Sequence, residues 1–228
     1  MSLEFFHDKM KLPRPDDWRE ERQKGNPMIK NIVFDMGHVL VDYSSKPVCE
    51  HFIEDVLDRE RVRTAVFVSP EWNMLDIGVL TDEQALEQIC SRLPQRLHEA
   101  AALCLRDWHL YNMKPIREME PVVRDLKTKG YGIYVCSNAA IRLVDLYRDL
   151  FPAPECYDGV LFSAEVKCIK PQKEIYYHLF ERFSLKPEEC YFIDDLPINI
   201  EGGRACGMDG YCFADGDMEK LKAVLEKL

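Results

Sequence analysis

Short apolar runs recur along the chain between polar segments, and each run predicts a β-strand. The runs are rich in β-branched and aromatic residues and are bounded by glycine, proline, aspartate or asparagine, as is typical of strands. Five such runs occur, at residues 31–35, 132–137, 159–163, 190–194 and 210–213. The pattern therefore predicts a sheet of five strands.

Helical patterns separate the later runs and set the direction of the strands. Apolar residues recur with helical spacing in segments 116–128, 140–149, 173–183, 199–206 and 217–228. Strands that alternate with helices form a parallel sheet with right-handed crossovers. The expected fold class is therefore α/β, with a parallel sheet flanked by helices.

The interval between the first strand and segment 116–128 breaks this alternation, because it contains helical patterns and no convincing strand. Thr81 begins a capping box with Gln84, and residues 95–110 carry apolar side chains at helical spacing. A crossover needs only one helix, so the additional helices are interpreted as an insertion. Two readings stay open at this point: a small α-helical cap domain seated over the strand ends, or helices that enlarge the core.

The chain is divided on this basis into a core, a cap and an extension. Residues 28–42 and 113–228 are expected to form the core, and residues 43–112 the helical cap. Residues 1–27 are charged and lack the apolar centre of a signal peptide, so they are expected to form an N-terminal extension.

The composition is that of a globular protein with an acidic balance. Hydrophobic residues make up 46% of the chain and charged residues 31%, which is typical of a protein with a substantial core. The formal net charge of −10 argues against a nucleic-acid partner, which requires a basic surface. An anionic substrate would need local cations, because the overall field repels it.

The cysteines and the apolar stretches indicate a cytoplasmic protein. The nine cysteines are scattered and include no C-x-x-C pair, as expected for core thiols in a reducing compartment. No apolar stretch approaches the ~20 residues that a membrane span needs, so no membrane is expected among the partners.

Three acidic residues at the ends of two predicted strands carry the candidate chemistry. Asp35 ends the first run, and Asp194 and Asp195 end the fourth. Functional groups of open parallel sheets sit at the carboxyl ends of strands, so these carboxylates are expected at one edge. They would supply a nucleophile and a hard-cation site, which points to phosphoryl transfer. Alternatively, Asp35 bonds its own turn and Asp195 caps the following helix.

Two further groups suit the same edge. Ser137 and Asn138 end the second run and precede a helix, so they can hold a phosphate oxygen or cap that helix. Lys170 precedes another predicted helix, from which a lysine can reach back over a carboxylate and a phosphate. A solvated surface position is the alternative for Lys170, and Lys167 is a nearby competitor.

The chain carries four motifs in the order typical of the haloacid dehalogenase-like (HAD) hydrolase superfamily, and in this it resembles that superfamily. The motifs are Phe34-Asp35-Met36-Gly37, Cys136-Ser137-Asn138, Lys170-Pro171 and Ile193-Asp194-Asp195. The resemblance covers residues 28–214 and includes a helical insertion after the first motif. The first motif, of the form D-x-G-x-V, is similar to that of a capped phosphatase branch that includes sugar-1-phosphate phosphatases of bacteria.

The resemblance implies a Rossmann-like sheet, a Mg²⁺ cofactor and hydrolysis of a small phosphorylated metabolite, such as a sugar phosphate. The phosphate monoester would be cleaved through an aspartyl-phosphate on Asp35. Ser137 and Asn138 would bind the phosphoryl group, and Lys170 would position Asp35 and stabilise the charge. The implied Mg²⁺ ligands are Asp35, the Gly37 carbonyl, Asp194 and Asp195.

Gly37 departs from the pattern of most phosphatases of this superfamily, which carry a second aspartate at that position. The aspartate protonates the leaving group and later activates water, and such help is worth roughly 10²–10⁴-fold in rate. His38 is adjacent and is a candidate replacement, because histidine titrates near neutrality. A packing role for His38 is favoured.

Three competing functions remain open. A phosphotransferase would differ only in the acceptor of the phosphoryl group. A metal-independent 2-haloacid dehalogenase shares the fold and the nucleophile, but usually has an aromatic residue where Gly37 stands and lacks the paired acids. A catalytically impaired phosphoryl-binding module would explain the missing aspartate, but the retention of every phosphate and metal position opposes it.

Overall fold

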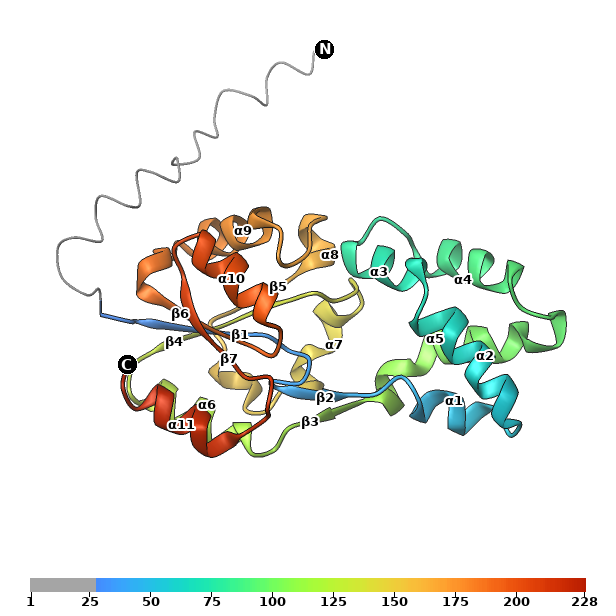
Figure 1. Cartoon of the computed structure of the whole chain (residues 1–228), viewed down its shortest axis with the longest axis horizontal. Coiled ribbons are helices and arrows are strands. Elements are labelled where there is room, and N and C mark those ends of the chain that lie inside the picture. Colours follow the sequence, from blue (N-terminus) through green and yellow to red (C-terminus); the bar gives the residue numbers. More distant parts are fainter. Residues whose placement is uncertain (1–27) are drawn as a thin grey trace, which may run out of the picture.

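The computed structural model describes residues 28–228, so the extension expected over residues 1–27 lies outside the described part of the chain. A five-stranded parallel sheet forms its centre (Figure 1). The strands are β1 (Asn31–Phe34), β4 (Gly132–Ser137), β5 (Gly159–Phe162), β6 (Cys190–Asp194) and β7 (Asp209–Cys212). The α/β fold and its five predicted strands are confirmed, with each boundary within about one residue.

The order of the strands determines where a ligand can bind. The sheet runs β5-β4-β1-β6-β7, so the chain moves outward from β1 to β5 and then returns to the other side of β1. The strand order therefore reverses at the β1–β6 pair. Ligands of open α/β sheets bind outside the carboxyl ends of the strands at such a switch point.

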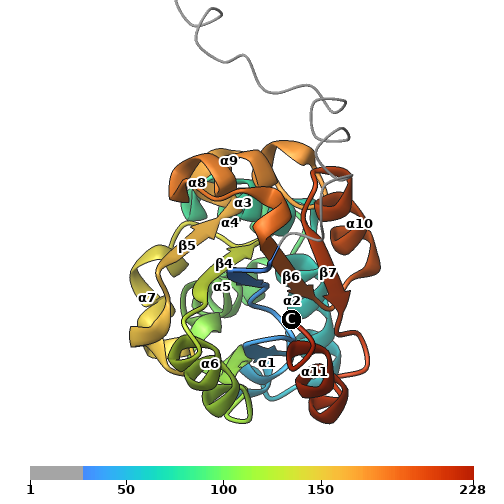
Figure 2. The same ribbon diagram turned by 90° about the vertical axis from the view of Figure 1, so that its left-hand side faces the viewer.

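Helices cover both faces of the sheet (Figure 2). One apolar cluster joins the sheet to α9 (Lys173–Phe183) and α10 (Pro197–Ala205). The other joins it to α6 (Met119–Thr128), α7 (Leu143–Leu150) and α11 (Met218–Leu225). Neighbouring residues of β1 serve opposite faces, because side chains alternate along a strand. Val33 belongs to the first cluster, whereas Ile32 and Phe34 belong to the second.

A second group of helices follows the first strand and lies to one side of the sheet (Figure 1). Its members are α1 (Pro47–Phe52), α2 (Val56–Phe67), α3 (Pro70–Ile77), α4 (Asp82–Ser91) and α5 (His98–Asn112). The capping box predicted at Thr81 is present at the start of α4. Three short 3₁₀ helices, Gln95–Leu97, Pro154–Cys156 and Pro187–Glu189, complete the described part with α8 (Ser163–Val166).

Two short strands that the sequence pattern did not predict link this helical group to the core. β2 (Val41–Tyr43) and β3 (Met113–Pro115) pair antiparallel in a separate ribbon. Each has three residues, which is too short for alternation to be recognised in sequence. The ribbon lies at both boundaries of the predicted cap. The division of the chain into cap and core at residues 43–112 stays a prediction.

Helix α3 meets the core directly. Gly78, just after α3, has φ 74° and approaches α8 so closely that a Cβ atom would lie 2.4 Å from the Ala164 carbonyl oxygen. Only glycine permits both the left-handed backbone and this contact. Lys167 donates a hydrogen bond to the Gly78 carbonyl. None of the helices in residues 28–228 has the length and apolar character needed to cross a membrane.

Candidate active site

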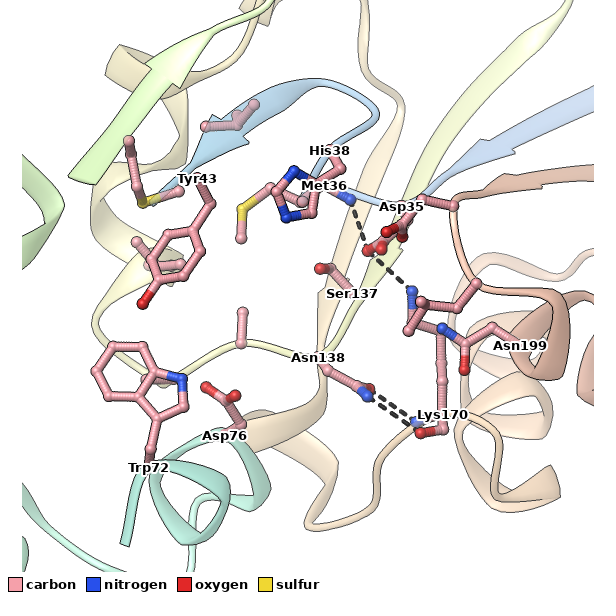
Figure 3. Close-up of a pocket in the computed structure, with 18 of the residues that line it drawn as sticks. Asp35, Met36, His38, Tyr43, Trp72, Asp76, Ser137, Asn138, Lys170 and Asn199 are labelled. Atoms are coloured by element: carbon pink, nitrogen blue, oxygen red, sulfur yellow. Dashed lines mark hydrogen bonds and ion pairs between the residues drawn. The ribbon is translucent and has the colours of Figure 1, made fainter. Parts of the chain in front are cut away.

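The ends of three adjacent strands bring the candidate residues together. The backbone N–H of Asp35 donates to the Ile193 carbonyl at 2.8 Å, so Asp35 continues the β1–β6 pairing. Ser137 and Asp194 are the last residues of β4 and β6, the two neighbours of β1. Because all three strands are parallel, their carboxyl ends lie at one edge of the sheet (Figure 3).

Lys170 is the buried cation of this edge. Its Nζ lies 2.8 Å from Asp35 Oδ1 and 2.6 Å from Asp194 Oδ2, and its side chain is 1% exposed. Burial by itself lowers the pKa of Lys170, but the two carboxylates outweigh it and raise the pKa well above its ordinary range. The lysine is therefore charged. Lys167, its competitor in sequence, is exposed.

Opposing effects act on the pKa of the Asp35 carboxyl group. Burial raises the pKa of its carboxyl group, and the Lys170 ammonium opposes that shift. The Asp35 carboxylate also accepts a hydrogen bond from the Met36 N–H at 2.6 Å. The lysine and the backbone donor together favour the ionised form, in which a carboxylate acts as a nucleophile.

Asp194 is fully buried and bonded on both oxygens. Oδ1 accepts from the Leu196 N–H at 2.8 Å, and Oδ2 accepts from Lys170. Asn199, in the first turn of α10, donates from Nδ2 to both oxygens at 3.0 and 3.1 Å. Asp194 thus orients Lys170 and is itself held by α10.

Asp195 is the more accessible acid of the pair. It lines the cavity in front of Asp35, whereas Asp194 does not. Burial raises its pKa, and the neighbouring Asp194 carboxylate adds to the shift. Ligand oxygens of Asp35, Asp194 and Asp195 all lie within 4.8 Å of one another. Carboxylates gathered so closely at one point are the donor set that a hard cation such as Mg²⁺ requires.

Ser137 and Asn138 serve different purposes. The Ser137 hydroxyl faces Asp35 and lowers the pKa of that carboxyl, and both residues line the same cavity. The side chain of Asn138 holds the backbone of Lys170: Oδ1 accepts from its N–H at 2.7 Å, and Nδ2 donates to its carbonyl at 3.1 Å. The side-chain amide of Asn138 is therefore already engaged by the protein. Substrate contact by Asn138 stays a prediction.

The turn after β1 carries Gly37 and His38. A Cβ atom built on Gly37 would meet no atom within 4 Å, and its backbone is outside the left-handed region. His38 has φ 55°, and its Nδ1 lies 3.8 Å from Asp42 Oδ1 in an exposed pair. Both residues line the cavity, so the contribution of His38 to catalysis stays open to test.

A cavity of about 220 Å³ extends from Asp35 toward the helical segment. Tyr43, Trp72 and Trp108 form an aromatic wall, with Trp72 and Trp108 ring centroids 5.0 Å apart. Asp76, from the end of α3, also lines the cavity. Figure 3 shows Asp76 beside Trp72, across the cavity from Asp35 and Lys170.

Two of these residues were missed in the sequence. Nothing in the sequence marks Asn199 as a functional residue except its position in a predicted helix that follows Asp194 and Asp195. Asp76 gave a weak one, because it lies in the last turn of α3, where a negative charge opposes the helix dipole and no basic residue compensates. Such local conflicts between sequence and structure are expected at functional sites.

Sequence comparison relates the chain to named phosphatases. Sesquiterpene phosphatase astK of Aspergillus oryzae is 24% identical over 192 residues, which cover 82% of this chain and 90% of that protein. Pyrophosphatase PpaX of Bacillus cereus is 23% identical over 183 residues, covering 78% of this chain and 80% of its own length.

Solved structures show the same fold. A predicted HAD-like family hydrolase from Porphyromonas gingivalis superposes with a TM-score of 0.66 at 21% identity, covering 87% of this chain and 98% of its own. A HAD family enzyme from Bacteroides thetaiotaomicron, in complex with magnesium and inorganic phosphate, gives 0.63 at 20% identity and coverages of 81% and 93%. The L-2-haloacid dehalogenase of Xanthobacter autotrophicus gives 0.61 at 16% identity, with coverages of 86% and 81%.

The family comparison covers most of the described chain. The sequence model of the haloacid dehalogenase-like hydrolases matches residues 29–207, a span that contains all four motifs and the helical segment. The chain is therefore a hydrolase and belongs to the haloacid dehalogenase-like hydrolase family.

Proposed function

We propose that the protein is a Mg²⁺-dependent phosphatase that hydrolyses a small phosphate monoester through an aspartyl-phosphate on Asp35. The observation that carries the proposal is the buried pairing of Asp35 with Lys170, beside the Ser137 hydroxyl and a cluster of three carboxylates. The phosphatase names of two relatives support it. Release of phosphate from a panel of phosphorylated metabolites, with Mg²⁺ and with EDTA, tests it directly.

The donor set suits the proposed cofactor. Asp35, Asp195 and the Gly37 carbonyl, supported by Asp194, would hold Mg²⁺, which keeps several waters and needs few protein ligands. When bound, the ion would offset the negative charge that the phosphate brings to an acidic site. Lys170 contributes a second, permanent positive charge at the same place.

Each side chain of the site has its own role in phosphoryl transfer. A carboxylate oxygen of Asp35 forms a bond to phosphorus while the bond to the ester oxygen breaks, and the leaving alkoxide takes a proton from water. Ser137 donates to a phosphoryl oxygen, and Lys170 stabilises the negative charge. Water then attacks the aspartyl-phosphate, which releases phosphate and restores Asp35.

The dehalogenase alternative is less well supported. Likeness to a 2-haloacid dehalogenase at 16% identity indicates the shared fold alone. Displacement of a halide at carbon has no need of a hard-cation site, so the cluster of Asp35, Asp194 and Asp195 favours phosphate chemistry. The same cluster argues against an impaired phosphoryl-binding module.

The Ser137→Ala variant should lower kcat by roughly 10²–10³-fold, as expected for loss of one preorganised donor. Ser137 is 2% exposed, so the substitution removes a hydroxyl and little packing. Steady-state kinetics on the best substrate of the panel provide the measurement. A variant with unchanged kcat would exclude Ser137 as a donor to the transferring group.

The Asp195→Asn variant should raise the Mg²⁺ concentration needed for half-maximal activity, by roughly tenfold or more. Asp195 faces the cavity and has fewer protein partners than Asp194. The Asp194→Asn variant should also lower kcat at saturating Mg²⁺, because it weakens the contact with Lys170. If the Mg²⁺ titrations of the wild type and Asp195→Asn superimpose, Asp195 is not a ligand.

The Gly37→Asp variant should raise turnover of alkyl phosphates, by up to the roughly 10²–10⁴-fold that general acid–base help provides. The position has room for the side chain, since an added Cβ meets no atom within 4 Å. Aryl phosphates should gain much less, because their leaving groups depart without a proton. The ratio of alkyl to aryl turnover is the measurement, and an unchanged ratio would contradict the expectation.

A further inference from the structure

The cavity has two chemically different ends. Near Asp35, charged and polar groups line it. At the other end, residues between 41 and 113 line it, and most of these side chains are apolar or aromatic: Val41, Trp72, Trp108 and Met113. Within the described chain, Tyr43 and Asp76 are the two lining residues of this end that carry an oxygen in the side chain.

Among residues 28–228 the Tyr43 hydroxyl has no hydrogen-bond partner. Its oxygen is buried and unpaired within the described structure, although its ring packs against Trp72 and Trp108. Burial raises the pKa of Tyr43, and the Asp76 carboxylate adds to the shift, which places the two groups in the same electrostatic environment. Buried hydroxyls without partners are rare in folded proteins, so this one is expected to be satisfied by a ligand.

Asp76 has no cationic partner in the part of the chain that the structure describes. Within residues 28–228 its side chain takes part in no ion pair, and burial raises its pKa to about 7 against the opposing effect of the Ala140 N–H. Lys167, at the C-terminal end of α8, donates instead to the Gly78 carbonyl. The Asp76 backbone carbonyl accepts from the Ser163 hydroxyl, which ties the end of α3 to the core. The Asp76 carboxylate lines the cavity (Figure 3).

We propose that Asp76 and Tyr43 recognise a hydrogen-bond donor at the far end of an otherwise apolar leaving group. A hydroxyl group there would accept from Tyr43 and donate to Asp76, and an ammonium group would donate to both. The substrate class is thus a phosphate monoester of an aromatic or aliphatic alcohol that carries one such group. This inference rests on the proposed phosphatase function and gives it a specificity.

The same walls disfavour a sugar. A polyol would place several hydroxyl groups against Trp72, Trp108 and Met113, where they would lose water without gaining partners. Unpaired polar groups weaken binding, so a sugar phosphate would bind less well than an apolar ester of the same size. The sugar phosphate expected from the motif is therefore replaced in this proposal by a more apolar ester.

Matched aryl phosphates test the proposal with Mg²⁺ present. The probes are 4-methylphenyl phosphate, 4-(hydroxymethyl)phenyl phosphate and 4-(2-aminoethyl)phenyl phosphate, which differ mainly at the end remote from phosphorus. We expect kcat/KM to be roughly tenfold or more higher for at least one donor-bearing probe than for the methyl probe. The Asp76→Ala variant should abolish this preference, and Tyr43→Phe should reduce it.

The variants also separate the two donor types and control for folding. Asp76→Asn keeps an acceptor but no charge, so it should retain a preference for the hydroxymethyl probe and lose one for the aminoethyl probe. The control is Glu87→Gln, which removes an exposed carboxylate from α4 and should leave all ratios unchanged. Equal kcat/KM for the three probes in the wild type, or an unchanged preference in Asp76→Ala, would overturn the proposal.

A binding measurement keeps this test independent of the chemistry. The Asp35→Asn variant is expected to bind the probes without turning them over, so calorimetric titration of this variant reports recognition alone. The donor-bearing probe should bind more tightly, and a further Asp76→Ala substitution should equalise the three affinities. Absence of turnover in the wild type, with the binding preference intact, would reject the phosphatase function and leave the recognition site standing. Equal affinities for the three probes in Asp35→Asn would reject the site.

Discussion

Replacing Asp35 with asparagine is expected to abolish phosphate release, by roughly 10⁴-fold or more, as when a covalent nucleophile is removed from other enzymes. The substitution is nearly isosteric and keeps an acceptor for the Met36 N–H, so the fold should survive. Phosphate release by the purified variant, together with its melting temperature, provides the measurement.

A matched control separates loss of the nucleophile from loss of one acidic residue. Asp149→Asn removes an exposed carboxylate on α7 and should retain wild-type turnover. Trapping of a phosphorylated protein from the wild type, and none from Asp35→Asn, would add direct support. Undiminished hydrolysis by Asp35→Asn would reject the aspartyl-phosphate mechanism.

Replacing Lys170 with methionine is expected to remove activity and to destabilise the fold by about 3–5 kcal/mol, the usual effect of deleting one partner of a buried ion pair. The variant leaves the carboxylates of Asp35 and Asp194 facing each other with no cation between them. Urea denaturation in metal-free buffer measures the loss in the free energy of unfolding.

The pH dependence of that loss has a predictable sign. Burial already raises the pKa of Asp35 above its unfolded value, and removing Lys170 takes away the main opposing influence. A carboxyl whose pKa is raised on folding binds more protons in the folded state, so its destabilising effect grows as the pH rises. The deficit of Lys170→Met should therefore shrink on acidification.

Lys167→Met is the control for this experiment. Lys167 is exposed and, within residues 28–228, its side chain bonds only the Gly78 carbonyl, so its loss should alter stability by less than about 1 kcal/mol. If Lys170→Met and Lys167→Met proved equally stable at neutral pH, Lys170 would not be the counter-ion of the buried acids.

The strands and the order of the motifs were determined by the sequence alone. Short apolar runs that are bounded by turn residues and separated by helices favour parallel β-strands. The strands of the described sheet coincide with these runs. Parallel strands must carry their carboxyl ends to one edge, so the convergence of Asp35, Ser137 and Asp194 followed from the pattern before any contact was known. The β2–β3 ribbon was not predictable, because three residues per strand carry no usable periodicity.

Tertiary structure decided how the residues of the site are used. The sequence motif favours Lys170 and leaves Lys167 as a competitor, and the packing of the segment before α9 buries Lys170 and exposes Lys167. Similarly, α10 closes over Asp194 and leaves Asp195 facing the cavity. Burial and partner choice depend on elements far apart in the chain, and local pattern contains neither.

The set of residues that line the far end of the cavity was the feature least predictable from sequence. Tyr43 and Asp76 belong to different elements, and 32 intervening residues separate them in the chain. They share a chamber because the ribbon after β1 and the close approach of Gly78 to Ala164 bring both toward the strand ends. Sequence alone predicted a site for phosphoryl chemistry at this edge of the sheet. The apolar walls and the two polar groups at the far end of the cavity exist only once the helices are packed, because they come from side chains that share no local pattern.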